Sequence, residues 1–102
     1  MKKFKIVFTD EAMADINRSF ECGKKNWGIE QARNWYRDLR SNIRKSLGIL
    51  PLGLPIAPET DELGMEVRHL IVGRYRVIFE IIDRTVRIVH VKGAFVDESH
   101  RR

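Results

Sequence analysis

Apolar residues near the amino terminus first alternate with polar ones and then recur every three or four positions. Over residues 3–8, Phe4, Ile6 and Phe8 fall on one side and Lys3, Lys5 and Val7 on the other, which is the period of a half-buried strand. Thr9 follows, a residue type that accepts hydrogen bonds from the free amides at the start of a helix. The apolar face of that helix comprises Ala12, Met13, Ile16 and Phe20. The pattern predicts a strand over 3–8 and then a helix that weakens towards a turn over 22–26.

A second, longer amphipathic stretch follows this turn, with basic side chains opposite its apolar stripe. The stripe comprises Ile29, Ala32, Tyr36, Leu39, Ile43, Leu47 and Leu50. Gly48 and Pro51 are expected to end the helix, because proline has no amide to donate. Further prolines and glycines predict irregular chain to about Glu62. Two helices joined by a short turn make an antiparallel helical hairpin.

The remaining chain returns to the spacing of strands. These are expected over 65–72, 75–82 and 85–92, with tight turns at Gly73-Arg74 and Asp83-Arg84. An antiparallel meander is the simplest arrangement of the three. The chain is therefore predicted to be a single α+β domain over 1–102, of order β-α-α-β-β-β. The hairpin covers one face of a four-stranded sheet and leaves the other at least partly open, and 94–102 form a loose tail.

The charge balance favours polyanionic partners. Nineteen Lys and Arg against fourteen Asp and Glu give a net charge of +5 and a pI near 9.7. Solubility alone is the other explanation for such a charge. Cys22 is the only cysteine, which excludes an internal disulfide and fits the reducing cytoplasm. The amino terminus is interpreted as a first strand and not as a signal peptide, and no apolar run is long enough to span a membrane.

The sequence contains no motif for a metal, a cofactor or a nucleophile. It lacks a glycine-rich phosphate loop, an HExxH sequence, zinc-spaced thiols and a calcium loop. We therefore expect no cofactor and no metal. Glu59, Asp61 and Glu62 in the irregular segment are expected to balance nearby cations.

Arg76 is the strongest candidate for a functional residue. Alternation over 75–82 places its apolar neighbours beneath the helices and Arg76 on the less covered face, at the centre of the sheet. A guanidinium there can hold a phosphate group with two parallel hydrogen bonds. The alternative is an ion pair with Glu80 on the same strand or with Glu66 across the strand pair.

The neighbouring strands add further cationic and imidazole side chains, namely Arg68, His69, Arg87, His90 and Lys92. Strict alternation places His90 and Lys92 on a face with Val86 and Ile88, and Arg87 on the other face with Val89 and Val91. Not every cation is therefore expected to point the same way. A cluster on the open face would neutralise RNA phosphates and stabilise charge at a scissile phosphodiester without a metal. His90 is a candidate acid or base, or else a structural histidine.

Several local sequences carry a family resemblance. They are TDEAMADI, QARNWYRDLRSNIRKSL, ILPLGLP, VRHLIVGRYRVIFEI and VRIVHV. Together, over residues 3–93, they resemble the RelE/ParE superfamily of bacterial toxins from type II toxin–antitoxin modules, which includes plasmid stabilisation proteins. The resemblance implies a small antiparallel sheet with a packed helical hairpin. It also implies a growth-inhibiting toxin that is neutralised by a cognate antitoxin.

The superfamily has two branches with different targets. One, like RelE, cleaves mRNA on the ribosome with basic residues of the sheet, and the other, like ParE, inhibits DNA gyrase. Arg76 in GRYR matches the arginine with which the nuclease branch stabilises the cleaved phosphate, and Arg68 is similar to a basic residue of the preceding strand. His90 or Lys92 would replace the arginine and tyrosine that this branch presents after its last strand.

The resemblance leaves three hypotheses open. The first is a ribosome-dependent, metal-independent endoribonuclease that uses Arg76, Arg68, His90 and Lys92, with the ribosome and mRNA as partners. The second is a ParE-like gyrase inhibitor that acts by binding without catalysis. It is motivated by the missing terminal tyrosine and by Glu66, where the nuclease branch tends to carry lysine. The third is an inactive member that only binds an antitoxin. Whether the protein is an enzyme stays open.

Overall fold

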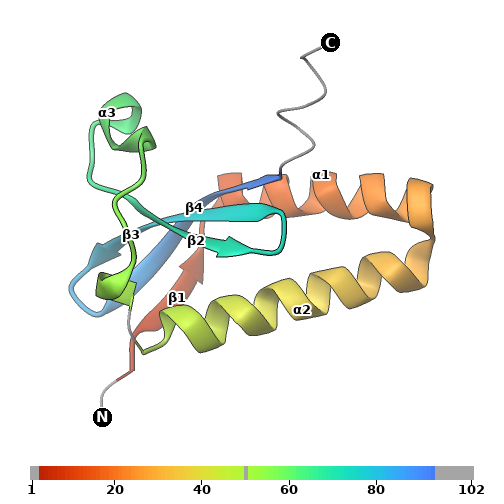
Figure 1. Cartoon of the computed structure of the whole chain (residues 1–102), viewed down its shortest axis with the longest axis horizontal. Helices are drawn as coiled ribbons and strands as arrows, with labels where there is room; N and C mark the ends of the chain where they lie inside the picture. The colour runs from red at the N-terminus through yellow and green to blue at the C-terminus, as the bar shows by residue number, and fades with distance from the viewer. Residues whose placement is uncertain (1–2, 50, 94–102) are drawn as a thin grey trace.

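The computed structural model describes residues 3–49 and 51–93. Within them the elements are β1 (Lys5–Phe8), α1 (Asp10–Trp27), α2 (Ile29–Leu47), η1 (Pro51–Gly53), α3 (Glu59–Leu63), β2 (Arg68–Val72), β3 (Tyr75–Ile82) and β4 (Thr85–Gly93). Figure 1 shows α1 and α2 side by side, with their connection projecting past the sheet. The expected order β-α-α-β-β-β is confirmed, with the short η1 and α3 added between α2 and β2. Leu50 and the tail over 94–102 lie outside the described residues.

A single residue links the two long helices. α1 begins after Thr9, whose hydroxyl oxygen accepts a hydrogen bond from the Ala12 amide at 3.2 Å, as expected. The expected weakening over 22–26 is wrong, because α1 continues to Trp27. Gly23 is buried within the helix, so packing outweighs its low helix propensity. The chain reverses at Gly28, whose φ of 95° favours glycine.

The proline-containing segment is more ordered than its composition suggested. The expectation of irregular chain to about Glu62 is wrong at its end, where the five-residue α3 forms. The Thr60 hydroxyl accepts a hydrogen bond from the Val67 amide at 3.0 Å and donates one to the Val67 carbonyl at 3.1 Å. The Ala57 amide also donates to the Val67 carbonyl at 2.8 Å. Hydrogen bonds with Val67, which lies beyond the end of the helix, therefore fix this helix, and local propensity does not predict them.

The sheet has the strand order β1-β4-β3-β2. β2, β3 and β4 form the expected antiparallel meander, and β1 is parallel to β4 at the edge. The two expected turns are confirmed, with positive φ at Gly73 (62°) and at Asp83 (56°). β1 is shorter than the predicted strand, and the second predicted strand begins at Arg68 instead of residue 65.

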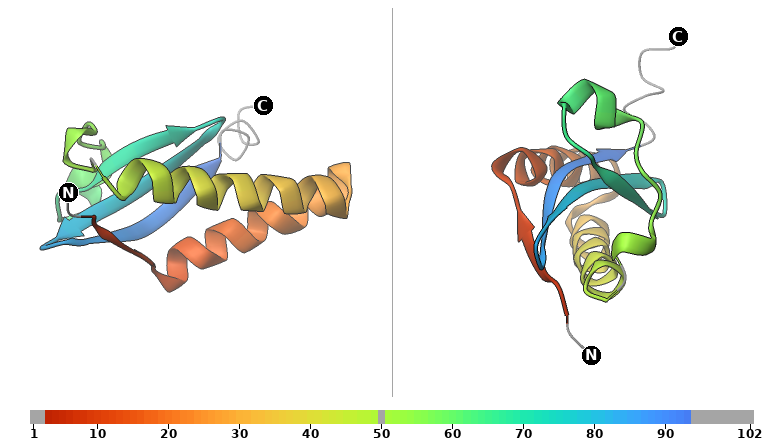
Figure 2. Two further views of the ribbon diagram at one scale, coloured as in Figure 1. Left: turned by 90° about the horizontal axis from the view of Figure 1, so that it is seen from below. Right: turned by 90° about the vertical axis from the view of Figure 1, so that its left-hand side faces the viewer.

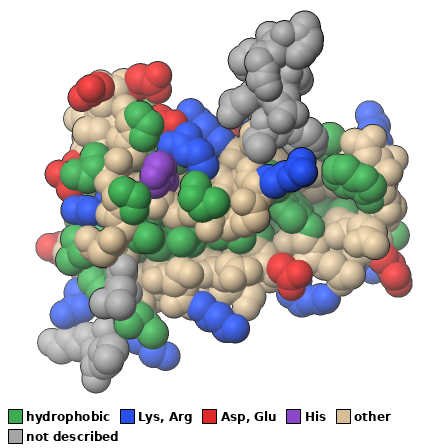
Figure 3. All heavy atoms as spheres, viewed as in Figure 1, with side chains coloured by type: hydrophobic (Ala, Val, Ile, Leu, Met, Phe, Trp, Pro, Cys, Tyr) green, Lys and Arg blue, Asp and Glu red, His purple; other side chains and the backbone are tan. Residues whose placement is uncertain are grey.

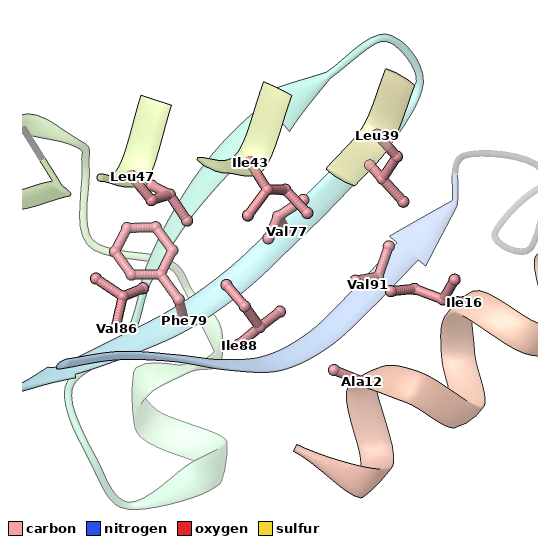
Figure 4. Close-up of a cluster of buried hydrophobic side chains, with 10 residues drawn as sticks. All are labelled: Ala12, Ile16, Leu39, Ile43, Leu47, Val77, Phe79, Val86, Ile88 and Val91. Carbon is pink, nitrogen blue, oxygen red and sulfur yellow. The ribbon is translucent and has the colours of Figure 1, made fainter. Parts of the chain in front are cut away.

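The main core lies between the helical hairpin and one face of the sheet, as expected. Its buried members are Ala12, Ile16, Leu39, Ile43, Leu47, Val77, Phe79, Val86, Ile88 and Val91. Figure 4 shows side chains of α2 pointing onto β3 and side chains of α1 beside β4. A smaller cluster of Ala57, Val67 and Ile78 lies on the opposite face. The views in Figure 2 and Figure 1 place α3 and α2 on opposite sides of the β2–β3 hairpin, so the second face is partly covered.

A β-bulge changes which residues of β4 share a face. Ile88 pairs with Phe79 and His90 pairs with Ile78, so Val89 is the additional residue. Beyond it, Lys92 pairs with Arg76, while before it Arg87 pairs with Glu80. The prediction from strict alternation is therefore wrong, because directly opposed residues share a face and the bulge reverses the alternation. Arg76, Arg87, His90 and Lys92 all belong to the face opposite the helices.

No helix among residues 3–49 and 51–93 combines the length and apolar character that crossing a membrane requires.

Candidate functional site

Arg76 lies at the centre of the face opposite the helices and is paired with a carboxylate. Its Nη1 donates to Glu59 Oε2 at 2.9 Å and its Nη2 donates to Glu59 Oε1 at 2.7 Å. Two parallel hydrogen bonds of this kind match the fork of a guanidinium to the plane of a carboxylate. Arg76 comes from β3 and Glu59 from the first turn of α3. The sequence alternatives for its partner, Glu80 and Glu66, instead pair with Arg87 and Arg68.

Two further side chains complete this group. Lys92 of β4 places Nζ 3.2 Å from Glu59 Oε2, so two cations share one carboxylate. His69 of β2 places Nδ1 3.0 Å from Arg76 Nη2 and 3.3 Å from Arg76 Nε. A guanidinium can only donate, so Nδ1 is the acceptor and the proton of the neutral imidazole is on Nε2. We call Arg76, Lys92, His69 and Glu59 the central cluster.

Glu59 is the buried charged residue of the described chain, with 8% of its surface exposed. Its hydrogen bonds with Arg76 lower its pKa from the ordinary 4.5 to about 2, and the bond with Lys92 acts in the same direction. Burial alone would raise the pKa, but these interactions outweigh it. Glu59 therefore stays ionised at physiological pH, and its charge neutralises one of its two cationic partners.

His90 lies on the same face but contacts a different carboxylate. Its Nδ1 is 3.0 Å from Asp15 Oδ2 on α1, and the Val91 amide donates to the same oxygen at 2.9 Å. Arg18 pairs with the other carboxylate oxygen. Asp15 thus fixes the imidazole in one orientation and directs its Nε2 away from the carboxylate. This is how an acid or base is positioned, and it equally suits a structural contact.

Arg68 is not brought to the central cluster. It pairs in register with Phe79, whose side chain belongs to the helix face. Its guanidinium donates to the Leu54 carbonyl at 2.6 Å and to Glu66 Oε2 at 3.3 Å. Of the four candidate residues, the structure therefore gathers Arg76, His90 and Lys92 on one face and places Arg68 elsewhere. His69 lies beside Arg76 instead.

The basic side chains of this face are paired with carboxylates, one of which comes from α1. Arg87 is paired with Glu80, Arg76 and Lys92 share Glu59, and Arg18 and His90 share Asp15. In Figure 3 positive side chains gather beneath α3, while acidic side chains lie on α3 itself. A phosphate group that approached Arg76 would have to replace Glu59, because the carboxylate occupies both terminal nitrogens. No group of three His, Cys, Asp or Glu side chains suited to a metal occurs within the described parts of the chain.

A groove lies apart from this face, between the helical hairpin and the β2–β3 turn. It has a volume of about 640 Å³ and is lined mainly by Ser19, Gly23, Trp27, Gln31, Ala32, Trp35, Arg74 and Tyr75. The Trp35 and Tyr75 rings are in contact, with centroids 5.1 Å apart. Trp27 is 64% exposed and Arg74 is exposed. Aromatic surface beside one cation suits a partner with apolar and acidic side chains.

The sequence indicated Arg76 but not the partners that define its surroundings. Glu59 was one of three acids expected to balance cations, and nothing local marks it as buried. Asp15 had a signal that sequence reasoning missed. It lies three residues after Ala12 and one before Ile16, both buried, so it is a carboxylate beside the apolar face of a helix.

The chain matches over residues 6–94 the family described as ParE toxin of type II toxin–antitoxin system, parDE. The protein belongs to this toxin family. The superfamily resemblance expected from the sequence is thereby confirmed. No curated protein matches the chain.

Solved structures similar to this ParE-family toxin come from toxin–antitoxin systems. One is described as the chromosomal ParDE system from P. aeruginosa, with a TM-score of 0.72 and 16% identity over 88% of this chain and 95% of that one. Another is the toxin–antitoxin complex RelBE2 from Mycobacterium tuberculosis. It gives a TM-score of 0.56 and 18% identity over 89% of this chain and 98% of that one. At these identities the likeness shows a shared fold.

The lowered pKa of Glu59 predicts a stability change in acid. Between pH 4.5 and about 2 the unfolded chain binds the proton and the folded protein does not, so the contribution of ionised Glu59 is complete above this window and is lost as the pH falls through it. The difference in free energy of unfolding between wild type and Glu59→Gln should shrink by on the order of 3 kcal/mol across the window. Urea denaturation at successive pH values measures it. A difference that is independent of pH would contradict the assignment.

Proposed function

We propose that this toxin inhibits growth by binding its target without cleaving RNA, with DNA gyrase as the target. One observation carries the choice. Arg76, the residue that would stabilise a cleaved phosphate, already has both terminal nitrogens bonded to Glu59. The match to the ParE family over residues 6–94 supports the same choice.

The arrangement of the other candidates agrees with binding. Charge stabilisation in a transition state requires donors that are directed at the developing charge and have no competing partner. Lys92 pairs with the same Glu59 as Arg76, and Arg68 bonds to Leu54 and Glu66 in the segments that precede β2. Each candidate cation of the face is therefore already paired with a carboxylate, although Arg76 and Lys92 together still outnumber their shared Glu59 by one charge.

Purified toxin should inhibit DNA supercoiling by gyrase in a dose-dependent manner. Its action should not require translation, since the proposed mechanism involves no ribosome. An assay with relaxed plasmid, gyrase and ATP measures this, with heat-unfolded toxin as the control. Unchanged supercoiling at a large molar excess of folded toxin would contradict the proposal. Expression without growth arrest would instead favour an inactive member of the family.

The ribosome-dependent ribonuclease is the second candidate, and one observation favours it. The bulge gathers Arg76, Lys92 and His90 on one face, and Asp15 fixes His90 with Nε2 directed away from the carboxylate. A cation and an oriented imidazole are the groups that metal-independent RNA cleavage needs. This mechanism would first require Glu59 to leave Arg76.

The ribonuclease hypothesis predicts new cuts in translated messages after expression of the toxin. Arg76→Ala should then slow cleavage by roughly a hundredfold, the usual cost of losing one charge-stabilising donor. Primer extension on RNA from expressing cells measures the cuts. Circular dichroism of the variant shows whether it is folded. Toxic expression without cuts would exclude this mechanism.

We also propose that an antitoxin binds the groove beside Trp27. The similar structures come from toxin–antitoxin systems, and the groove combines exposed aromatic surface with the exposed cation Arg74. An amphipathic segment with acidic groups is complementary to both features. Apolar burial would supply most of the affinity, and charge would accelerate association.

Trp27→Ala should weaken binding of the protein encoded by the adjacent reading frame by tenfold or more, as roughly expected for loss of an aromatic anchor. Ile82→Ala is a matched control, because Ile82 is also exposed (48%) but lies at the β3–β4 turn. Isothermal titration calorimetry on both variants measures the change. Equal binding by the two variants would place the antitoxin on another surface.

A further inference from the structure

We infer that Glu59 determines the ligand specificity of the central cluster, because its carboxylate occupies a site that would otherwise bind a phosphate group of single-stranded nucleic acid. The biological use that we assign to this exclusion rests on the proposed function. Exclusion of RNA from the basic face suits an inhibitor that recognises a protein.

The geometry of the pair is that of a bound anion. Arg76 presents two parallel donors to the two oxygens of Glu59, at 2.7 and 2.9 Å, and Lys92 presents a third at 3.2 Å. Arginine uses the same fork for a phosphate group, and lysine adds a point charge. His69 Nδ1 accepts from Arg76 on the side of Nε, so the guanidinium is held in this orientation. The cluster is a formed anion site with an internal occupant.

α3 holds this occupant in place. The hydrogen bonds from Thr60 and Ala57 to Val67 attach the segment to the chain entering β2. Ala57 and Val67 also pack on Ile78, which is close to Arg76 on the same face of β3. The carboxylate is thereby positioned by the backbone on both sides of it. An external phosphate must therefore compete with a carboxylate that is already held in place. The phosphate loses translational and rotational freedom when it binds, and Glu59 does not.

The fold does not require a charged pair at this position, even though breaking the pair by protonating Glu59 would destabilise it. A partly buried ion pair gives little net stability compared with apolar side chains of similar volume, because both charges lose hydration. Arg76 is 29% exposed in its side chain and Glu59 11%. Glu59 is ionised at neutral pH, so the two donors of Arg76 face a full negative charge there. Exposed Asp61 and Glu62 on the same helix add repulsion towards a polyanion.

Glu59→Gln should unmask the site while preserving the shape of the side chain. We expect this variant to bind a fluorescein-labelled oligouridylate about tenfold more tightly than wild type at low salt, since a charge-assisted bidentate contact becomes available. The dependence of log affinity on log salt concentration should steepen by about one, because Arg76 and Lys92 then release counterions. Fluorescence anisotropy measures both quantities.

Glu62→Gln is the matched control. It removes the same charge from the same short helix, but Glu62 is exposed and forms no ion pair with Arg76. An equal gain in both variants would reduce the effect to net charge and overturn the inference. The double variant Glu59→Gln/Arg76→Ala should lose the gain, and its retention would also overturn it. Thermal melts by circular dichroism establish that each variant is folded.

Further outcomes test the class of ligand and distinguish a failure of this inference from a failure of the proposed function. A gain of Glu59→Gln for a glutamate-rich peptide but not for RNA would contradict the assignment to phosphate. Wild-type toxin that binds RNA as tightly as Glu59→Gln would show that Glu59 excludes nothing. Failure of wild type to inhibit gyrase would contradict the proposed function alone, because the RNA comparison does not depend on it.

Discussion

In an antiparallel pair, one additional residue in a strand reverses the face of every side chain beyond it, and β4 carries such a residue at Val89. This constraint lets one strand serve two purposes. Before the bulge, Val86 and Ile88 point into the main core. Beyond it, Val91 joins that core while His90 and Lys92 are directed to the opposite face. The same strand therefore supplies three core residues to one face and, beyond the bulge, two basic residues to the other.

The charge of that face is decided by elements outside the sheet. Glu59 belongs to α3 and pairs with Arg76 and Lys92. Asp15 belongs to α1 and pairs with Arg18 and His90. A net charge of +5 suggests attraction to any polyanion, but attraction at a distance differs from an available binding site. Under the proposed function, the paired carboxylates would weaken contacts with a phosphate backbone and leave the shape of the surface as the basis of recognition.

The sequence was sufficient for the fold because its signals were strong and local. Helical spacing, the Thr9 cap, the turn residues and the alternation in β3 all agreed with one arrangement. Strict alternation failed in β4 because no local residue marks Val89 as a bulge. α3 and the burial of Glu59 were missed for a related reason. They depend on contacts with Val67 and Arg76, which only the folded chain brings near.

The carboxylate of Asp15 has a consequence for assembly as well. β1 pairs with β4 only as far as Ile88, so the edge of β4 beyond this residue is not covered by β1. Asp15 accepts a hydrogen bond from the Val91 amide on this edge, and that amide is then not available to another strand. On the far rim, the segment around Ile56 covers the start of β2, where the His69 amide donates to the Pro55 carbonyl. Within the described residues, β1 and the last few residues of β2 therefore keep edges that are not paired with another strand. A second chain that extended this sheet by strand addition would therefore have only a short template on either side.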